Sequence, residues 1–130
     1  MAAGKYTFTI EQGATTDFEI VWTDSAGSAI DLANYEAAMV IRTDYGGSEI
    51  QALTSSIGDT YTKASGSAFL SLSGSGLTTP LTSGSIGVYI GHGLTDSFTF
   101  TEAVYDIELT KDQARTRILQ GKVKLSKDVT

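Results

Sequence analysis

Hydrophobic and polar residues alternate at the beginning of the chain, and this pattern predicts β-strands. Two runs each place hydrophobic side chains on one face; they are Tyr6, Phe8 and Ile10, followed by Phe18, Ile20 and Trp22. Gln12-Gly13-Ala14 interrupts the first run, and Asp24-Ser25-Ala26-Gly27-Ser28 has the composition of a chain reversal after the second. We therefore predict two strands with a corner between them, and Trp22 as a buried core aromatic.

The segment from residue 33 to residue 42 fits either a helix or a strand. Its Ala, Glu and Met residues favour helix. Its larger hydrophobic residues nevertheless share one face at alternate positions: Tyr35, Ala37, Met39 and Ile41. The run also leads directly into the turn sequence Asp44-Tyr45-Gly46-Gly47. The period of two therefore favours a strand.

Short segments separated by Gly and Ser follow, up to residue 85. They predict brief strands at residues 49–54, 59–63 and 68–72, within a variable and partly exposed insert at about residues 44–85. Pro80, the only proline, lacks a backbone donor and therefore marks a loop or a sheet edge.

The last part of the chain predicts a strand at residues 86–90, one helical turn between Gly93 and Phe100, and a long hairpin. The hairpin strands cover residues 103–110 and 115–126. About seven to nine short strands with closely spaced turns are typical of an all-β, immunoglobulin-like antiparallel β-sandwich. We expect a single sandwich domain over residues 1–130, with at most one short helical turn.

The composition is that of a folded domain, with 41% hydrophobic and 18% charged residues in 130. The absence of Cys excludes disulfides, thiol nucleophiles and thiolate metal ligands. A net charge of −6 disfavours binding to nucleic-acid phosphates. The sequence shows neither a signal peptide nor an apolar run long enough to span a membrane. We expect a protein made in the cytoplasm and not secreted, with neither nucleic acid nor membrane as a partner.

Groups suited to catalysis are sparse. His92, the only histidine, lies between two glycines at a predicted strand end, which indicates a surface loop rather than a triad or metal site. Asp106 and Glu108 could form a glycosidase pair. Their outward positions opposite Lys122 and Lys124 of the hairpin partner instead indicate a cross-strand charge pattern. We predict no enzymatic activity, no cofactor, no metal and no small-molecule substrate.

Tyrosines offer a different chemistry, because an exposed ring can stack on a sugar. The alternating pattern assigns Tyr6, Tyr35 and Tyr105 to the core. Tyr45 and Tyr61 lie in the variable segment. These two are therefore the candidate contact residues for a carbohydrate or another partner.

Charge is unevenly distributed along the chain. Residues 111–127 hold six basic groups and one acidic group, whereas residues 1–110 hold three basic and thirteen acidic groups. Lys122, Lys124 and Lys127 form a basic stripe on the last predicted strand, which we expect to be a sheet edge. The basic stripe either pairs with Asp106 and Glu108 within the chain, or docks onto an acidic surface of another copy or of a neighbouring protein.

Several stretches near the two ends of the chain form a distinctive pattern. They are Tyr6-x-Phe8-x-Ile10-Glu11-Gln12-Gly13-Ala14-Thr15, Phe18-x-Ile20-x-Trp22-x-Asp24, Ile30-Asp31-Leu32-x-x-Tyr35-x-Ala37-x-Met39-x-Ile41-Arg42, Val104-Tyr105-Asp106-Ile107-Glu108-Leu109, Arg117-Ile118-Leu119-Gln120-Gly121-Lys122-Val123 and Ser126-x-x-Val129-Thr130. In these stretches the chain resembles small immunoglobulin-like virion structural proteins of tailed bacteriophages. The resemblance covers roughly residues 5–43 and 86–130, and residues 48–85 do not follow a pattern of that group.

The resemblance implies a non-enzymatic virion component, a multi-copy adaptor or decoration subunit of the tail, neck, baseplate or capsid. In outline it is similar to the sandwich domains that attach receptor-binding proteins to phage baseplates. The implied partners are other virion proteins and copies of the same chain. A different class of function is a carbohydrate-binding adhesin module for host-surface recognition, in which Tyr45 and Tyr61 would contact the glycan.

Overall fold

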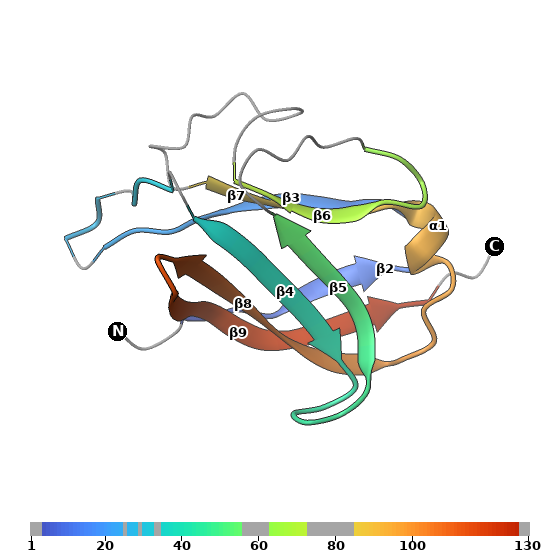
Figure 1. Ribbon diagram of the computed structural model, residues 1–130. Helices are drawn as coiled ribbons and strands as arrows, with labels where there is room; N and C mark the ends of the chain where they lie inside the picture. The colour runs from blue at the N-terminus through green and yellow to red at the C-terminus, as the bar shows by residue number, and fades with distance from the viewer. Residues whose placement is uncertain are drawn as a thin grey trace.

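Two β-sheets and one short helix make up the protein in a computed structural model that describes residues 4–24, 26–28, 30–32, 35–55, 63–72 and 85–127. The larger sheet contains β1 (Gly4–Lys5), β2 (Phe8–Glu11), β4 (Glu36–Arg42), β5 (Glu49–Ser55), β8 (Glu102–Lys111) and β9 (Ala114–Ser126). The smaller sheet contains β3 (Thr16–Val21), β6 (Ala68–Ser71) and β7 (Ser85–Ile90). The helix α1 (His92–Thr95) follows β7 at one end of the sandwich (Figure 1). The predicted all-β sandwich with one helical turn is confirmed.

Strand pairing is antiparallel except along one side of β9. The larger sheet has the order β1-β9-β8-β4-β5, with β2 also paired to β9, and the smaller sheet has the order β3-β7-β6. Both β1 and β2 run parallel to β9, in one continuous register, on the side opposite β8. This pairing departs from a fully antiparallel sandwich. It arises because the chain leaves β2 through a corner into the other sheet, so β2 has no hairpin partner of its own.

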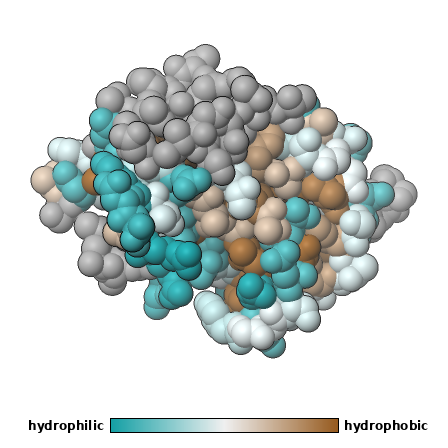
Figure 2. All heavy atoms as spheres, in the orientation of Figure 1, coloured by the Kyte–Doolittle hydropathy of each residue, from teal (hydrophilic) through white to brown (hydrophobic). Residues whose placement is uncertain are grey.

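Alternating burial fills the space between the sheets, as the sequence pattern predicts. In β4 the burial alternates residue by residue, with Ala37, Met39 and Ile41 facing inward, so the strand interpretation of this segment is confirmed. Full burial of a side chain as large as Met39 or Ile41 removes apolar surface from water and stabilises the folded state by about 1.5–3 kcal/mol. Figure 2 shows that hydrophobic residues also gather on the visible face around β5 and α1, while the opposite part of that face is mostly hydrophilic. The core therefore reaches the surface along this side of the sandwich.

Two aromatic residues lie farther from the core centre than the alternation predicts. Tyr6 is 48% exposed, so its assignment to the core is wrong: its ring lies 6.4 Å from that of Phe18 at the open side between the two sheets. Trp22 follows the end of β3 and is partly buried, edge-on to Tyr35 at 5.7 Å between ring centroids. Tyr105, in contrast, is buried as predicted.

Some predictions fall on residues that the structure does not describe. Residues 59–62 of one predicted strand, Pro80 and Tyr61 lie outside the described residues. The neighbouring predicted strands are confirmed as β5 and β6. The expectation of a single domain with a variable insert at residues 44–85 stays a prediction.

In the turn between β8 and β9, two residues adopt a strained backbone conformation that a glycine would relieve. Asp112 and Gln113 both have positive φ, 51° and 69°, without glycine at either position. A non-glycine residue pays a steric penalty in this left-handed region, and two-residue hairpin turns favour glycine at the second position. We expect Gln113→Gly to raise the free energy of unfolding by about 0.5–1 kcal/mol, measured by urea denaturation. Thr116→Gly within β9 serves as the matched control and should lower it, and a stability loss in Gln113→Gly would contradict the assignment of strain.

Candidate functional site

The basic stripe lies on a sheet face and not on a sheet edge. β9 pairs with β8 on one side and with β1 and β2 on the other, so the expectation that the last strand is an edge is wrong. Within β9, Val123 and Leu125 are buried while Lys122 and Lys124 are exposed. The two lysines therefore project from the outer face of the larger sheet, and Lys127 follows just beyond the end of the strand.

Carboxylates on β8 pair with arginines rather than with the basic stripe. Asp106 lies 3.3 Å from Arg117 and Glu108 lies 3.4 Å from Arg115, which confirms a cross-strand charge pattern. The expected lysine partners of these carboxylates are wrong, because the two-residue turn after Lys111 places Glu108 opposite Arg117. Lys122 and Lys124 lie farther along the hairpin, opposite Val104 and Glu102.

The three lysines of the basic stripe differ in their contacts. Lys122 lies opposite Val104 and pairs with Glu102 at 3.4 Å. Lys127 donates a long hydrogen bond of 3.4 Å to the carbonyl oxygen of Thr99. Lys124 lies opposite Glu102, but Glu102 makes its ion pair with Lys122. Among the described residues, Lys124 and Lys127 therefore form no ion pair.

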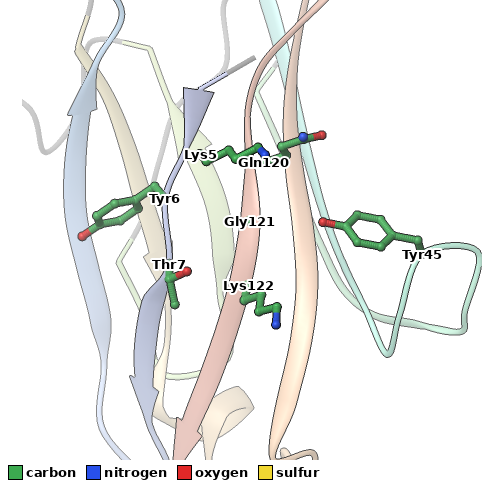
Figure 3. A pocket seen from close by; sticks show the side chains of 7 residues that line it. All are labelled: Lys5, Tyr6, Thr7, Tyr45, Gln120, Gly121 and Lys122. Carbon is green, nitrogen blue, oxygen red and sulfur yellow. The ribbon is translucent and has the colours of Figure 1, made fainter. Parts of the chain in front are cut away.

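A groove of about 360 Å³ lies beside Lys122, across β1, β9 and the loop between β4 and β5 (Figure 3). Its lining residues are Lys5, Tyr6, Thr7, Tyr45, Gln120, Gly121 and Lys122. In Figure 3 the Tyr6 ring points away from the groove, while the Tyr45 hydroxyl points toward β8 and β9. Two ammonium groups, an amide, a hydroxyl and one aromatic ring thus surround the groove, which we call the Tyr45 groove.

The floor of the Tyr45 groove is held by a close approach of two backbones. The Tyr6 amide donates to the Gln120 carbonyl at 3.0 Å, and the buried Tyr105 hydroxyl donates to the Tyr6 carbonyl at 2.7 Å. Any side chain at position 121 would collide with the Tyr6 carbonyl, so only Gly121 permits this approach. Burial, together with the neighbouring Tyr6, raises the pKa of the Tyr105 phenol above its ordinary value. The hydroxyl therefore remains a hydrogen-bond donor at neutral pH.

Tyr45 is presented by a tight turn on one wall of the groove. The Gly47 amide donates to the Asp44 carbonyl at 2.9 Å, and Gly46 has φ of 83°, the left-handed value required at the third position of a type II turn. The Thr43 amide donates to the Ser48 carbonyl at 3.0 Å and closes the loop. The Tyr45 side chain is nevertheless 72% exposed. An exposed aromatic ring therefore stands on a well-bonded backbone.

Tyr45 also borders a second hollow of about 220 Å³. Arg42 and Arg117 contribute positive charge there, and Asp44 and Asp106 contribute negative charge. Arg117 is paired with Asp106, and Arg42 donates to the Gly47 carbonyl at 3.2 Å. Charge on this side of Tyr45 is therefore balanced, in contrast to the side of Lys5 and Lys122.

An apolar hollow of about 280 Å³ lies at the open side between the sheets. Tyr6, Ile20, Val21, Trp22, Ile118 and Leu119 line it. Val21 is 60% exposed there. Sequence patterning gave no signal for this hollow, because it joins an exposed position of β3 to residues of β9 far away in the chain.

The remaining candidate groups lie apart from these hollows. His92 is exposed at the start of α1, as expected of a surface histidine. Within the ranges that the structure describes, no three His, Asp or Glu side chains are grouped so that they could hold a metal ion. No helix in the same ranges is long and apolar enough to cross a membrane.

Comparison with known proteins identifies neither a family nor a relative for this chain. No protein-family model matches the chain, and no curated protein matches its sequence.

Removal of the Tyr105 hydroxyl should weaken the fold and change its response to alkaline pH. Tyr105→Phe leaves the Tyr6 carbonyl without its donor and should cost about 1–2 kcal/mol at pH 7. The folded state raises the Tyr105 pKa, whereas an unfolded tyrosine ionises near pH 10. The contribution of this group is therefore fully present below about pH 10 and is lost as the pH rises further.

Urea denaturation at pH 7 and above pH 10 measures both effects. Tyr105→Phe should lose less stability between the two pH values than the unmodified protein does. The matched control is Tyr45→Phe, an exposed position, which should follow the unmodified protein at both pH values. Equal alkaline losses in all three proteins would contradict the role assigned to Tyr105.

Proposed function

We propose that this protein is a non-enzymatic structural component of a tailed-bacteriophage virion, a multi-copy adaptor or decoration subunit of the tail, neck, baseplate or capsid. The proposal rests on the resemblance at both ends of the chain and on one structural observation. Lys124 on the outer face of the larger sheet and Lys127 just beyond the end of β9 are exposed and form no ion pair with a described residue. Exposed positive charge on an otherwise acidic chain is suited to docking on an acidic neighbour.

The distribution of charge supports contacts between copies or with other virion proteins. Intramolecular pairing would satisfy the basic stripe if Asp106 and Glu108 contacted it, but arginines occupy both carboxylates. A second copy presents acidic side chains elsewhere, for example the exposed Glu49 at the start of β5 and Asp96 just after α1. The surface of one copy therefore carries groups that attract the lysines of another.

A role in assembly requires no catalytic groups, and the described residues have properties that fit such a role. His92 is exposed on α1, and the Tyr45 groove is lined by lysines and tyrosines without an acid–base pair. The protein would be made in the host cytoplasm and become part of the virion without secretion. Its partners would be virion proteins and further copies of the chain.

Charge reversal at two positions tests the docking surface. Lys124→Glu together with Lys127→Glu replaces attraction by repulsion and should weaken each contact by about 1–2 kcal/mol, roughly five- to thirtyfold. Virions from the phage that encodes this chain should then contain little of the variant, measured by mass spectrometry of purified particles. Binding of the unmodified protein to its virion partner should also weaken as salt rises.

Gln113→Glu is the control, because it adds negative charge at the far end of the same hairpin. It should be incorporated normally. Normal incorporation of the folded double variant, with binding that does not respond to salt, would contradict electrostatic docking through the basic stripe. Absence of the unmodified chain from purified virions would contradict the virion role itself.

Carbohydrate recognition is a second candidate function, favoured by the exposed ring of Tyr45 beside a groove with polar walls. Aromatic platforms of this kind bind sugar rings by stacking, and mixed donors and acceptors bind sugar hydroxyls. Binding on a glycan array that is lost in Tyr45→Ala and retained in Tyr45→Phe would support this function. An array without any bound glycan would contradict it.

A further inference from the structure

We propose that the Tyr45 groove binds a carboxylate-bearing oligosaccharide, with a sugar ring against Tyr45 and a uronate carboxylate between Lys5 and Lys122. This inference rests on the second candidate function, carbohydrate recognition, and gives it a ligand class and a position. It is independent of the basic stripe, because Lys124 and Lys127 do not line the groove.

Positive charge in the groove is not fully balanced. Lys5 makes no ion pair with any described residue, and Lys122 shares its charge with Glu102 at 3.4 Å. Both side chains line the same groove, from neighbouring strands (Figure 3). A ligand carboxylate placed there meets one unpaired ammonium group and one that is partly neutralised. The second hollow beyond Tyr45 is charge-balanced, so the acidic sugar is directed to the side of Lys5.

Tyr45 provides a preorganised stacking platform. Three backbone and side-chain bonds fix its loop: Gly47 to Asp44, Thr43 to Ser48, and the Ser48 amide to the Thr43 hydroxyl at 3.2 Å. Because the backbone is already ordered, a ligand need only order the tyrosine side chain itself. The ring thus offers apolar contact to the face of a sugar without a large entropic cost.

The remaining lining groups match sugar hydroxyls better than a peptide backbone. Gln120 supplies both a donor and an acceptor, and Thr7 supplies a hydroxyl. An acidic peptide would bind most readily by adding a strand, which needs free backbone groups. β9, which forms the floor of the groove, is paired on both sides, so a strand could be added only at the outer edge of β1 and β2 and not across the groove. Within the groove, contacts are therefore made by side chains, as they are for a saccharide.

Titration with a short oligogalacturonate, followed by NMR chemical shifts, tests the inference on the whole chain. Shifts should concentrate at Lys5, Gln120, Lys122 and Tyr45. Lys5→Gln should weaken binding by about two- to fivefold, as expected for one exposed ion pair. Tyr45→Ala should weaken it by about three- to tenfold, and Tyr45→Phe should bind nearly as well as the unmodified protein.

Lys124→Gln is the matched control, because it removes a positive charge from the same face of β9 outside the groove. It should leave the affinity unchanged apart from a small long-range effect. Thermal melting of each variant checks that the fold is retained, which is expected because all the altered side chains are exposed.

The methyl-esterified oligogalacturonate keeps the sugar rings and lacks the charge. Comparing it with the acid form therefore distinguishes carbohydrate recognition in general from recognition of the carboxylate. Weaker binding of the ester supports the inference. Equal binding of both forms would overturn the choice of an anionic ligand while carbohydrate recognition stands. Absence of binding by either form overturns the inference, and the glycan array then decides the function itself. Binding of polyglutamate that competes at Tyr45 would overturn it in favour of an acidic peptide.

Discussion

The close approach of the Tyr6 backbone to Gly121 is the constraint on which the larger sheet depends. It lets the first segment of the chain lie parallel to β9, and the Tyr105 hydroxyl completes the contact from inside the core. As a result β9 is enclosed on both sides, and only its outward side chains are available to a partner. The same approach creates the floor of the Tyr45 groove on one side and turns the Tyr6 ring toward the apolar hollow on the other.

Much of the fold is predictable because burial follows the alternation of single residues. Met39 and Ile41 show this in β4, where the period of two correctly outweighs the helical propensity of the neighbouring residues. Periodicity shows which way a side chain faces, but it does not show which strand lies beside it. For that reason the position of β9 inside the sheet could not be predicted, and the exposure of Tyr6 at the sheet border could not be either.

The candidate site shows the same limit, because local sequence indicates which side chains are exposed but not which strands bring them together. The exposure of Tyr45, Lys122 and Lys124 follows from local sequence, since turn residues and outward strand positions face water. Lys5 and Gln120 carried no signal, because they meet only through a parallel pairing between the two ends of the chain. The arginine partners of Asp106 and Glu108 also escaped prediction, because both ion pairs are diagonal. Each carboxylate contacts the arginine that lies opposite the residue two positions farther along β8, and the alternation of residues does not show such a contact.

Parallel pairing between the first and last strands has a mechanical consequence. The N-terminal end of the described chain lies at one end of the sandwich and the C-terminal end at the other (Figure 1). Tension between these ends would pull β2 and β9 past each other along their length. Their hydrogen bonds would then carry the load together instead of breaking one after another, as they do when an antiparallel hairpin is peeled open from its ends. A chain of linked sandwiches built in this way would resist stretching, a property that follows from strand direction alone and not from additional stability.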